Sequence, residues 1–251
     1  MKKVLITGAT SGIGEACADL FAREKYDMIF TGRRMDRLEK LAKRLKEKYE
    51  IEVVVLNFDV RNKEDVIQYL ERLPAEWKQV DVLINNAGLS QGLDPIQNGS
   101  YEDWDMMIDT NIKGLLYVSK VVSNWMIKQG SGHIINIGSI AGKEVYPNGN
   151  VYCATKHAVD ALSKAMRIDL LSSGIKVTAI HPGAVETEFS VVRFKGDEAR
   201  AKKVYDGFEP LIANDIAETI WFAVSRPAHV NINELIVMPT AQATTTNIFR
   251  K

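Results

Sequence analysis

The stretch Thr7-Gly8-Ala9-Thr10-Ser11-Gly12-Ile13-Gly14 decides the fold class of this chain. It lies between a short apolar run, Lys3–Thr7, and the start of a helical pattern, Ile13–Arg23. Glycines at such a junction allow a tight turn and a close approach of ligand to backbone, and the following helix N-terminus favours a diphosphate. The motif alone is a weak signal, but its place between a strand and a helix indicates a dinucleotide-binding βαβ unit.

Short β-branched runs alternate with longer helical patterns along the whole chain. The expected strands are Lys3–Thr7, Met28–Thr31, Val53–Phe58, Val82–Asn85, His133–Gly138, Lys176–His181 and Glu234–Met238. The expected helices are Ile13–Arg23, Arg37–Lys48, Lys63–Leu73, Trp104–Lys128, Val151–Leu171 and Asp215–Ser225. This alternation predicts a single-domain α/β fold over residues 1–251, a Rossmann-type doubly wound parallel sheet with helices on both faces.

Residues 184–213 form the one long irregular segment, with a short charged helix expected around Glu198–Tyr205. A connection of this length inside a compact domain is usually functional. We therefore expect residues 184–213 to form a substrate lid within the single domain.

The overall composition narrows the classes of partner. The chain has 32 Lys and Arg against 32 Asp and Glu, so no excess charge favours nucleic acid or an anionic membrane surface. The only cysteines are Cys17 and Cys153, and no Cys/His spacing suggests a metal site. The apolar run Val4-Leu5-Ile6 is too short for a signal peptide. We expect a cytoplasmic protein that binds a small-molecule substrate.

The end of the second strand indicates which dinucleotide is bound. Dinucleotide sites usually place an acidic residue there to accept hydrogen bonds from the adenosine ribose. Here the sequence is Thr31-Gly32-Arg33-Arg34, without a carboxylate. Two guanidinium groups match the 2′-phosphate of NADP(H). Alternatively, Arg33 and Arg34 only begin a solvated basic helix, since Arg37 and further cations follow.

Two other strands end in residues that fit a cofactor at the carboxyl edge of the sheet. Asp59-Val60 ends the third strand, where an aspartate could meet the adenine amino group. Asn85-Asn86-Ala87-Gly88 ends the fourth, which places small and amide groups beside the cofactor. Taken alone, either segment could be only a turn.

Three residues are candidates for acid–base chemistry. Ser139 follows the strand His133–Gly138, while Tyr152 and Lys156 are four residues apart and share one helical face. A phenol is a poor base at neutral pH, but a nearby ammonium group and an oxidised nicotinamide both favour the phenolate. Each residue alone has an ordinary structural explanation. Together they predict proton transfer by Tyr152 while hydride moves to or from NADP(H), with Ser139 holding the substrate oxygen.

Asn111 lies on the apolar stripe of the long helix Trp104–Lys128. A buried amide needs hydrogen-bond partners. It could be a structural amide satisfied by neighbouring backbone, or it could anchor a water chain that ends at Lys156 and relays protons. The pattern does not separate these two possibilities.

The ordered set of motifs resembles the short-chain dehydrogenase/reductase family over nearly the whole chain. The matching residues are Thr7–Gly14, Asn85–Gly88, Asn111, Ser139, Tyr152, Lys156, Pro182-Gly183 and Thr187. The resemblance implies a seven-stranded sheet, an Asn111–Ser139–Tyr152–Lys156 catalytic tetrad, contact of Lys156 with the nicotinamide ribose, and Thr187 near the carboxamide. The full set expected to bind NADP(H) is Gly8, Thr10, Ser11, Gly12, Ile13, Gly14, Arg33, Arg34, Asp59, Val60, Asn86, Ala87, Gly88, Tyr152, Lys156, Pro182, Gly183, Val185 and Thr187.

The C-terminal third resembles the NADP-dependent serine/3-hydroxy acid dehydrogenases, in the segments 188–197, 227–233 and 238–242. That resemblance implies oxidation of L-serine, L-allo-threonine or 3-hydroxyisobutyrate, or reduction of malonic semialdehyde. Such substrates carry a carboxylate, for which Lys143 and Arg193 are the candidate partners. Alternatively, both cations face solvent.

Two other functions stay open on the sequence alone. One is the same chemistry on another carbonyl, such as a ketone or sugar, and the other is an NADP-sensing protein without turnover. The family resemblance also implies a homo-oligomer, a dimer or homotetramer. Small residues opposite the catalytic face of the helix, at Ala154, Ala158, Ala161 and Ala165, would permit close helix packing.

Overall fold

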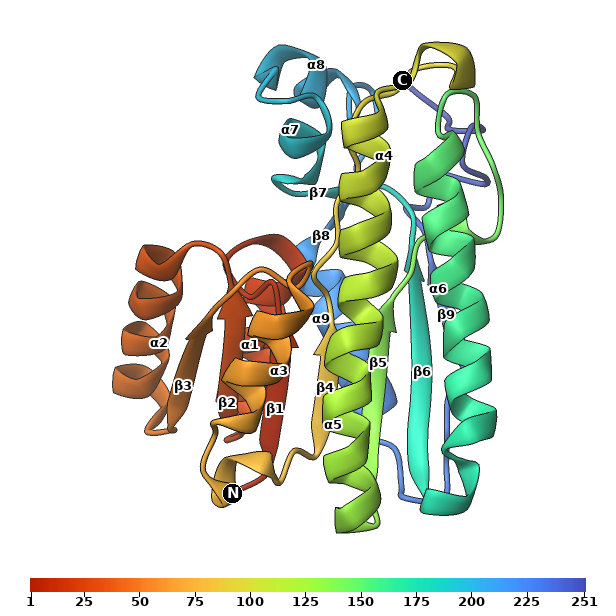
Figure 1. Ribbon diagram of the computed structural model, residues 1–251. Coiled ribbons are helices and arrows are strands. Elements are labelled where there is room, and N and C mark those ends of the chain that lie inside the picture. The colour runs from red at the N-terminus through yellow and green to blue at the C-terminus, as the bar shows by residue number, and fades with distance from the viewer.

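The computed structural model describes residues 1–251, and seven strands form its central parallel sheet (Figure 1). The strands are β1 Lys3–Thr7, β2 Asp27–Gly32, β3 Val53–Asn57, β4 Val82–Asn85, β5 Gly132–Ile137, β6 Ile175–Pro182 and β9 Glu234–Val237. Their order in the sheet is β3-β2-β1-β4-β5-β6-β9. The chain therefore reverses its winding direction between β1 and β4, and in such sheets ligands bind in the crevice at that point.

Helices cover both faces of the sheet, which confirms the doubly wound fold (Figure 1). One face carries α1 Gly12–Arg23, α2 Met35–Tyr49 and α9 Ala213–Val224. The other carries α3 Lys63–Glu71, α4 Tyr101–Ile108, α5 Leu115–Gln129 and α6 Asn150–Asp169. None of these helices is both long and apolar enough to span a membrane.

The strand β1 shows why the chain adopts this layered arrangement. Leu5 packs into one hydrophobic core, whereas Val4 and Ile6 pack into the core on the opposite face. All three side chains are fully buried. Side chains alternate between the two faces of a strand, so a continuous apolar run fits only a sheet covered on both sides.

The expected continuous helix Trp104–Lys128 is wrong in one respect. A π-helical turn at Asp109–Gly114 separates α4 from α5, although the two remain in line (Figure 1). Gly114 packs so closely on Val60 that a Cβ there would lie 2.7 Å from the Val60 Cγ2 atom. Apolar periodicity cannot detect such a turn, because the extra residue changes the hydrogen bonding without ending the helix.

Residues 184–213 stand above the carboxyl ends of the strands (Figure 1). The segment contains β7 Val185–Glu186, α7 Phe189–Arg193, α8 Glu198–Lys203 and β8 Leu211–Ile212. The expected charged helix around Glu198–Tyr205 corresponds to α8. The strands β7 and β8 pair in parallel at the base of the segment and hold its two ends together.

Candidate active site

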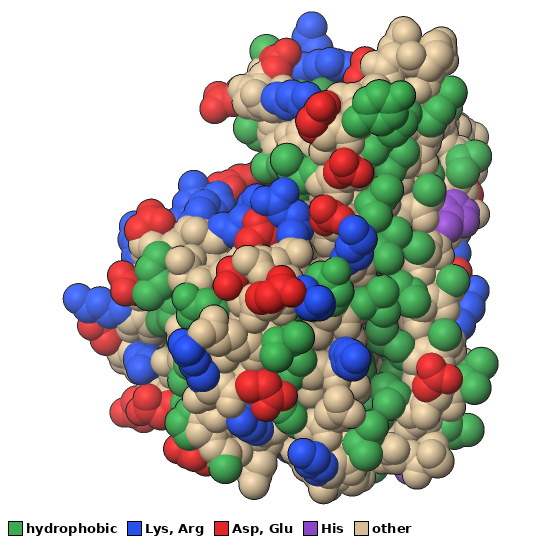
Figure 2. Space-filling model, in the orientation of Figure 1, with side chains coloured by type: hydrophobic (Ala, Val, Ile, Leu, Met, Phe, Trp, Pro, Cys, Tyr) green, Lys and Arg blue, Asp and Glu red, His purple; other side chains and the backbone are tan.

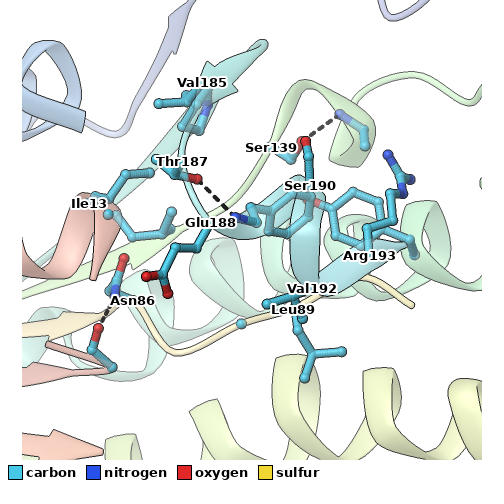
Figure 3. Close-up of a pocket in the computed structure, with 18 of the residues that line it drawn as sticks. Ile13, Asn86, Leu89, Ser139, Val185, Thr187, Glu188, Ser190, Val192 and Arg193 are labelled. Atoms are coloured by element: carbon cyan, nitrogen blue, oxygen red, sulfur yellow. Dashed lines mark hydrogen bonds between the residues drawn. The ribbon is translucent and has the colours of Figure 1, made fainter. Parts of the chain in front are cut away.

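A cavity of about 650 Å³ lies between the carboxyl ends of the strands and the segment 184–213. Figure 3 shows part of its wall, which includes Ser139 from the end of the sheet and Thr187, Glu188 and Arg193 from the segment 184–213. Nearly every residue expected to bind cofactor or substrate lines this cavity. The predicted site residues that do not line it are Gly14, Asn111 and Lys143.

The glycine-rich turn fits a diphosphate. Gly8 and Gly12 adopt left-handed backbone conformations, with φ of +68° and +55°. Gly14 has no room for a side chain, since a Cβ there would overlap the Gly8 carbonyl oxygen and approach the Asn86 Nδ2 atom to 2.6 Å. Ser11 begins α1 without a side-chain cap, so the first N–H groups of the helix stay available to an anion.

The amide of Asn86 braces this turn. Its Nδ2 atom donates to the carbonyl oxygens of Thr7 and Gly8, at 2.9 and 3.0 Å. The Thr7 hydroxyl in turn accepts from the backbone N–H groups of Asn86 and Ala87. The end of β4 is thereby tied to the turn after β1. Asn86 lines the cavity, but its side-chain amide group is used to hold the glycine-rich turn in shape.

Arg34 is oriented by the same turn. Its Nη2 atom donates to the Thr10 and Ser11 hydroxyls at 2.8 and 2.9 Å. Its Nη1 atom donates to the carboxylate of Glu188 at 2.9 Å, and Arg37 donates to the other oxygen of Glu188 at 2.7 Å. Arg37 and Glu188 were not among the predicted site residues. Arg37 looked like part of a solvated helix, and no sequence pattern connects Glu188 with either arginine.

Arg33 and Asp59 both line the cavity, but only Asp59 has a partner within the chain. Arg33 is exposed and makes no hydrogen bond or ion pair within the chain, so its guanidinium is available to a ligand. The Asp59 carboxylate instead accepts from Arg61, at 2.7 Å from Nη2 and 3.0 Å from Nε. The hydrogen bond between Asp59 and the adenine amino group therefore stays a prediction. The adenine would have to share the Asp59 carboxylate with Arg61.

Ser139, Tyr152 and Lys156 all line the same cavity, as the sequence predicts. The Ser139 hydroxyl accepts from the backbone N–H of Ala141 at 3.1 Å. The Lys156 Nζ atom donates to the Ile137 carbonyl oxygen at 2.9 Å and lies 6.0 Å from the centre of the Tyr152 ring. Ser139, from the turn after β5, and the α6 residues Tyr152 and Lys156 thus line one cavity together.

Burial shifts the acid–base properties of the pair on α6. It raises the pKa of the Tyr152 phenol, while the neighbouring Ser139 hydroxyl and the Arg193 charge lower it. Burial also lowers the pKa of the Lys156 ammonium to about 8. Both shifts have the same origin, because a water-poor site disfavours whichever form of a group is charged. Ionising Tyr152 therefore depends on positive charge within the site.

Asn111 lies in the π-helical turn, and both polar atoms of its side chain are hydrogen-bonded. Its Oδ1 atom accepts from the Leu89 N–H at 2.9 Å. Its Nδ2 atom donates to the Leu89 carbonyl oxygen at 2.8 Å and to the Thr155 hydroxyl at 3.0 Å. These contacts are those of a structural amide that ties the loop after β4 to α6. A proton relay to Lys156 stays a prediction.

Arg193 places a second cation, besides Lys156, close to the Tyr152 ring. It is the last residue of α7 and projects toward the cavity below the segment 184–213 (Figure 3). Its guanidinium carbon lies 5.4 Å from the ring centres of both Tyr146 and Tyr152, and it donates to the Tyr146 hydroxyl. Its buried Nε atom has no partner within the chain. Tyr146, which no motif marks, thus helps to orient the guanidinium.

Lys143 does not reach the cavity, which corrects the expectation that it binds substrate. Its Nζ atom donates to Asp160 on α6 at 2.9 Å and to Glu234 on β9. The turn after Ser139 directs the side chain away from the cavity, into an ion-paired cluster. Asp160, Glu234 and the buried His181 could form a metal site by spacing, but Lys143 already supplies positive charge there.

The C-terminal residues beyond β9 contribute to the site, although none of them was among the predicted site residues. Gln242 lines the cavity and accepts from the Ala184 N–H at 2.8 Å. Arg250 donates to backbone carbonyls of Asp206 and Val204. The tail therefore braces the segment 184–213 at its start and near its end. These residues have no helical or strand periodicity, so no pattern could connect them with the site.

Together, the fold and the site define a Rossmann-fold dinucleotide-binding protein with a Ser–Tyr–Lys centre. The chain belongs to the short-chain dehydrogenase family, whose family model matches residues 2–198. The resemblance in the sequence is thereby confirmed.

Individual relatives match over almost the full length. The chain is 47% identical over 241 residues to the NADP-dependent 3-hydroxy acid dehydrogenase YdfG of Salmonella typhi, covering 96% of each chain. It is 45% identical to sulfoacetaldehyde reductase 2 of Chromohalobacter salexigens, covering 96% of this chain and 95% of that protein. Among solved structures, the closed form of a serine dehydrogenase complexed with NADP+ matches with a TM-score of 0.92 and 45% identity. The match covers 99% of this chain and 100% of that one.

Proposed function

We propose that the protein is an NADP(H)-dependent dehydrogenase that interconverts the hydroxyl and carbonyl forms of a small 3-hydroxy acid. The observation that carries the substrate class is the guanidinium of Arg193, 5.4 Å from the Tyr152 ring centre and with an unpartnered buried Nε atom. A carboxylate matches that group in charge and geometry. The proposal is supported by relatives named for NADP-dependent 3-hydroxy acid and serine dehydrogenation.

The residues of the site can divide the chemistry between them. When bound, NADP+ supplies the hydride acceptor, and the hydroxyl proton goes to the Tyr152 phenolate. Ser139 already accepts the Ala141 N–H, so its own O–H is available to donate to the substrate oxygen. Lys156 holds positive charge near Tyr152 and would contact the nicotinamide ribose. Reduction of the aldehyde runs the same steps backwards, with the neutral phenol giving the proton.

The cofactor is held along the cavity by backbone and by charge. The turn Gly8–Gly14 and the start of α1 hold the diphosphate, while Arg33 and Arg34 bind the 2′-phosphate. Val60, Ala87 and Gly88 line the same cavity and would contact the adenosine and the middle of the cofactor. The nicotinamide would be held by Pro182, Gly183, Val185 and Thr187, which also line the cavity.

Three further assignments belong to this proposal. Residues 184–213 act as a substrate lid, because they roof the cavity and carry Arg193. The enzyme assembles as a symmetric homodimer or homotetramer, which is the usual state of this family. It works in the cytoplasm, in keeping with two buried cysteines that form no disulfide.

A substrate screen tests the proposed activity. L-Serine, L-allo-threonine and 3-hydroxyisobutyrate are each compared with their methyl esters, using NADP+ or NAD+ and following nicotinamide absorbance. Loss of one charge-assisted hydrogen bond, roughly 1.5–3 kcal/mol, should lower kcat/KM by about 10- to 100-fold for the esters. Equal turnover of the acids and their methyl esters would favour another carbonyl substrate. Turnover of uncharged ketones or sugars as fast as that of the acids would favour the same conclusion.

Two more arms of the screen separate the remaining candidates. Malonic semialdehyde and sulfoacetaldehyde are offered with NADPH, because a sulfonate also carries one negative charge and one relative is named for it. Faster reduction of sulfoacetaldehyde would assign a sulfonate as the natural anion. Tight NADPH binding without turnover on any of these compounds would instead indicate a sensing protein.

A further inference from the structure

Glu188 connects the segment 184–213 to Arg34 and Arg37, which follow the second strand of the sheet. It follows Thr187 directly and precedes α7. Its two carboxylate oxygens accept from different arginines, Oε2 from Arg34 at 2.9 Å and Oε1 from Arg37 at 2.7 Å. These hydrogen bonds, from Arg37 first and then Arg34, hold the pKa of Glu188 below its usual value. Glu188 is therefore a carboxylate at neutral pH.

The position of this carboxylate is set by the glycine-rich turn. Thr10 and Ser11 hold the Nη2 edge of Arg34, which leaves Nη1 directed at Glu188. All four residues line the same cavity. Figure 3 shows the Glu188 carboxylate projecting from the segment toward the side of the cavity where Ile13 and Asn86 lie. An anion site is thus built beside the turn, and a side chain of the same protein occupies it.

A carboxylate on a guanidinium and a phosphate on a guanidinium use the same donors. A phosphate monoester carries more negative charge than a carboxylate, so it can compete for Arg34. The free 2′-hydroxyl of NAD(H) carries no charge, so it cannot replace the Glu188 carboxylate at Arg34. Occupation of the anion site by Glu188 therefore affects the binding of NADP(H) but not the binding of NAD(H).

We propose that Glu188 is a specificity-determining residue that moderates the preference for NADP(H), because its carboxylate holds the anion position at Arg34 until the 2′-phosphate of NADP(H) replaces it. This inference rests on the proposed binding of the 2′-phosphate by Arg34. Glu188 neutralises Arg34 and Arg37 in the free enzyme, and only a phosphorylated dinucleotide displaces it.

Replacing Glu188 by glutamine tests the exchange. Glu188→Gln keeps the side-chain size but removes the competing charge. Two partly exposed ion pairs of this kind predict NADPH binding that is tighter by about 3- to 10-fold, with NADH affinity unchanged. Fluorescence titration measures both dissociation constants without turnover. Glu186→Gln is the matched control, because Glu186 is an exposed carboxylate two residues earlier that does not line the cavity.

A double-mutant cycle identifies the partner of Glu188. In a protein with Arg34→Met and Arg37→Met, adding Glu188→Gln should no longer tighten NADPH binding, because no arginine remains to compete for. Adenosine 2′,5′-bisphosphate should reproduce the whole pattern and adenosine 5′-monophosphate should not, since only the first carries the 2′-phosphate.

Each opposite result has a distinct meaning. Weaker NADPH binding in Glu188→Gln would show that Glu188 helps to present the arginines, and it would overturn the exchange. Equal tightening for NADH would show a general loosening of the segment and would overturn the specificity role. Unchanged NADPH binding in Arg34→Met alone would instead remove the proposed phosphate assignment of Arg34.

Discussion

The guanidinium carbon of Arg193 lies 5.4 Å from the centre of the Tyr152 ring, so a cation from the segment 184–213 faces the acid–base residue on α6. Its hydrogen bond to the Tyr146 hydroxyl holds it in that place. A substrate with its hydroxyl at Tyr152 can therefore reach Arg193 with an acidic group a few bonds away. In Figure 2, Lys and Arg side chains gather at the hollow below the segment 184–213, with Asp and Glu side chains among them.

Arg193→Met should weaken the recognition of 3-hydroxy acids and leave their methyl esters almost unaffected. Loss of a charge-assisted hydrogen bond predicts a fall in kcat/KM of about 10- to 100-fold for the acids. Steady-state kinetics with both substrate forms would measure it. Lys195→Met is a suitable control, because Lys195 is a highly exposed cation paired with Asp103 outside the cavity. An equal loss for acids and esters would contradict the charge role.

Tyr152→Phe should abolish most turnover while NADPH affinity stays near normal. The substitution keeps the ring that packs near Phe189 and removes only the oxygen that exchanges the proton. Positioned acid–base groups supply about 10²–10⁴ in rate. Single-turnover kinetics and a parallel NADPH titration would separate chemistry from binding. A variant with near-normal turnover would remove Tyr152 from the mechanism.

The rate of alcohol oxidation should rise with pH on the alkaline side, and the rate of carbonyl reduction should fall there. Oxidation needs the Tyr152 phenolate, whereas reduction needs the neutral phenol. Burial raises the pKa of Tyr152, so the phenolate fraction keeps increasing as the pH rises above neutrality. Rates measured in both directions at saturating cofactor would test the sign. A flat oxidation profile with chemistry rate-limiting would contradict the assignment.

Replacing both Arg33 and Arg34 by alanine should raise the KM for NADP+ far more than the KM for NAD+. The 2′-phosphate is the only group that distinguishes the two molecules, and Arg33 has no partner within the chain. A differential contribution of roughly 3–5 kcal/mol predicts a loss of preference of about 10²–10³ or more. High salt should also weaken NADP+ binding selectively. Full retention of NADP+ preference would place the phosphate partner elsewhere.

Local sequence patterns predicted the parts of this protein that depend on neighbouring residues. The turn Gly8–Gly14 follows from backbone freedom at Gly8 and Gly12, which only glycine supplies without strain. The shared face of Tyr152 and Lys156 follows from helical spacing. The carboxyl ends of parallel strands meet at one edge, so Ser139 could be placed beside them before any tertiary contact was known.

By itself, then, the sequence determined the doubly wound sheet, the dinucleotide turn and the Ser139–Tyr152–Lys156 centre. The tertiary structure alone decided which charges share the cavity. It turned Lys143 outward to Asp160 and Glu234, and brought Glu188 to Arg34 across 154 positions. The reason is physical: glycine turns and helical faces are set by residues a few positions apart, whereas ion pairs depend on how distant segments pack.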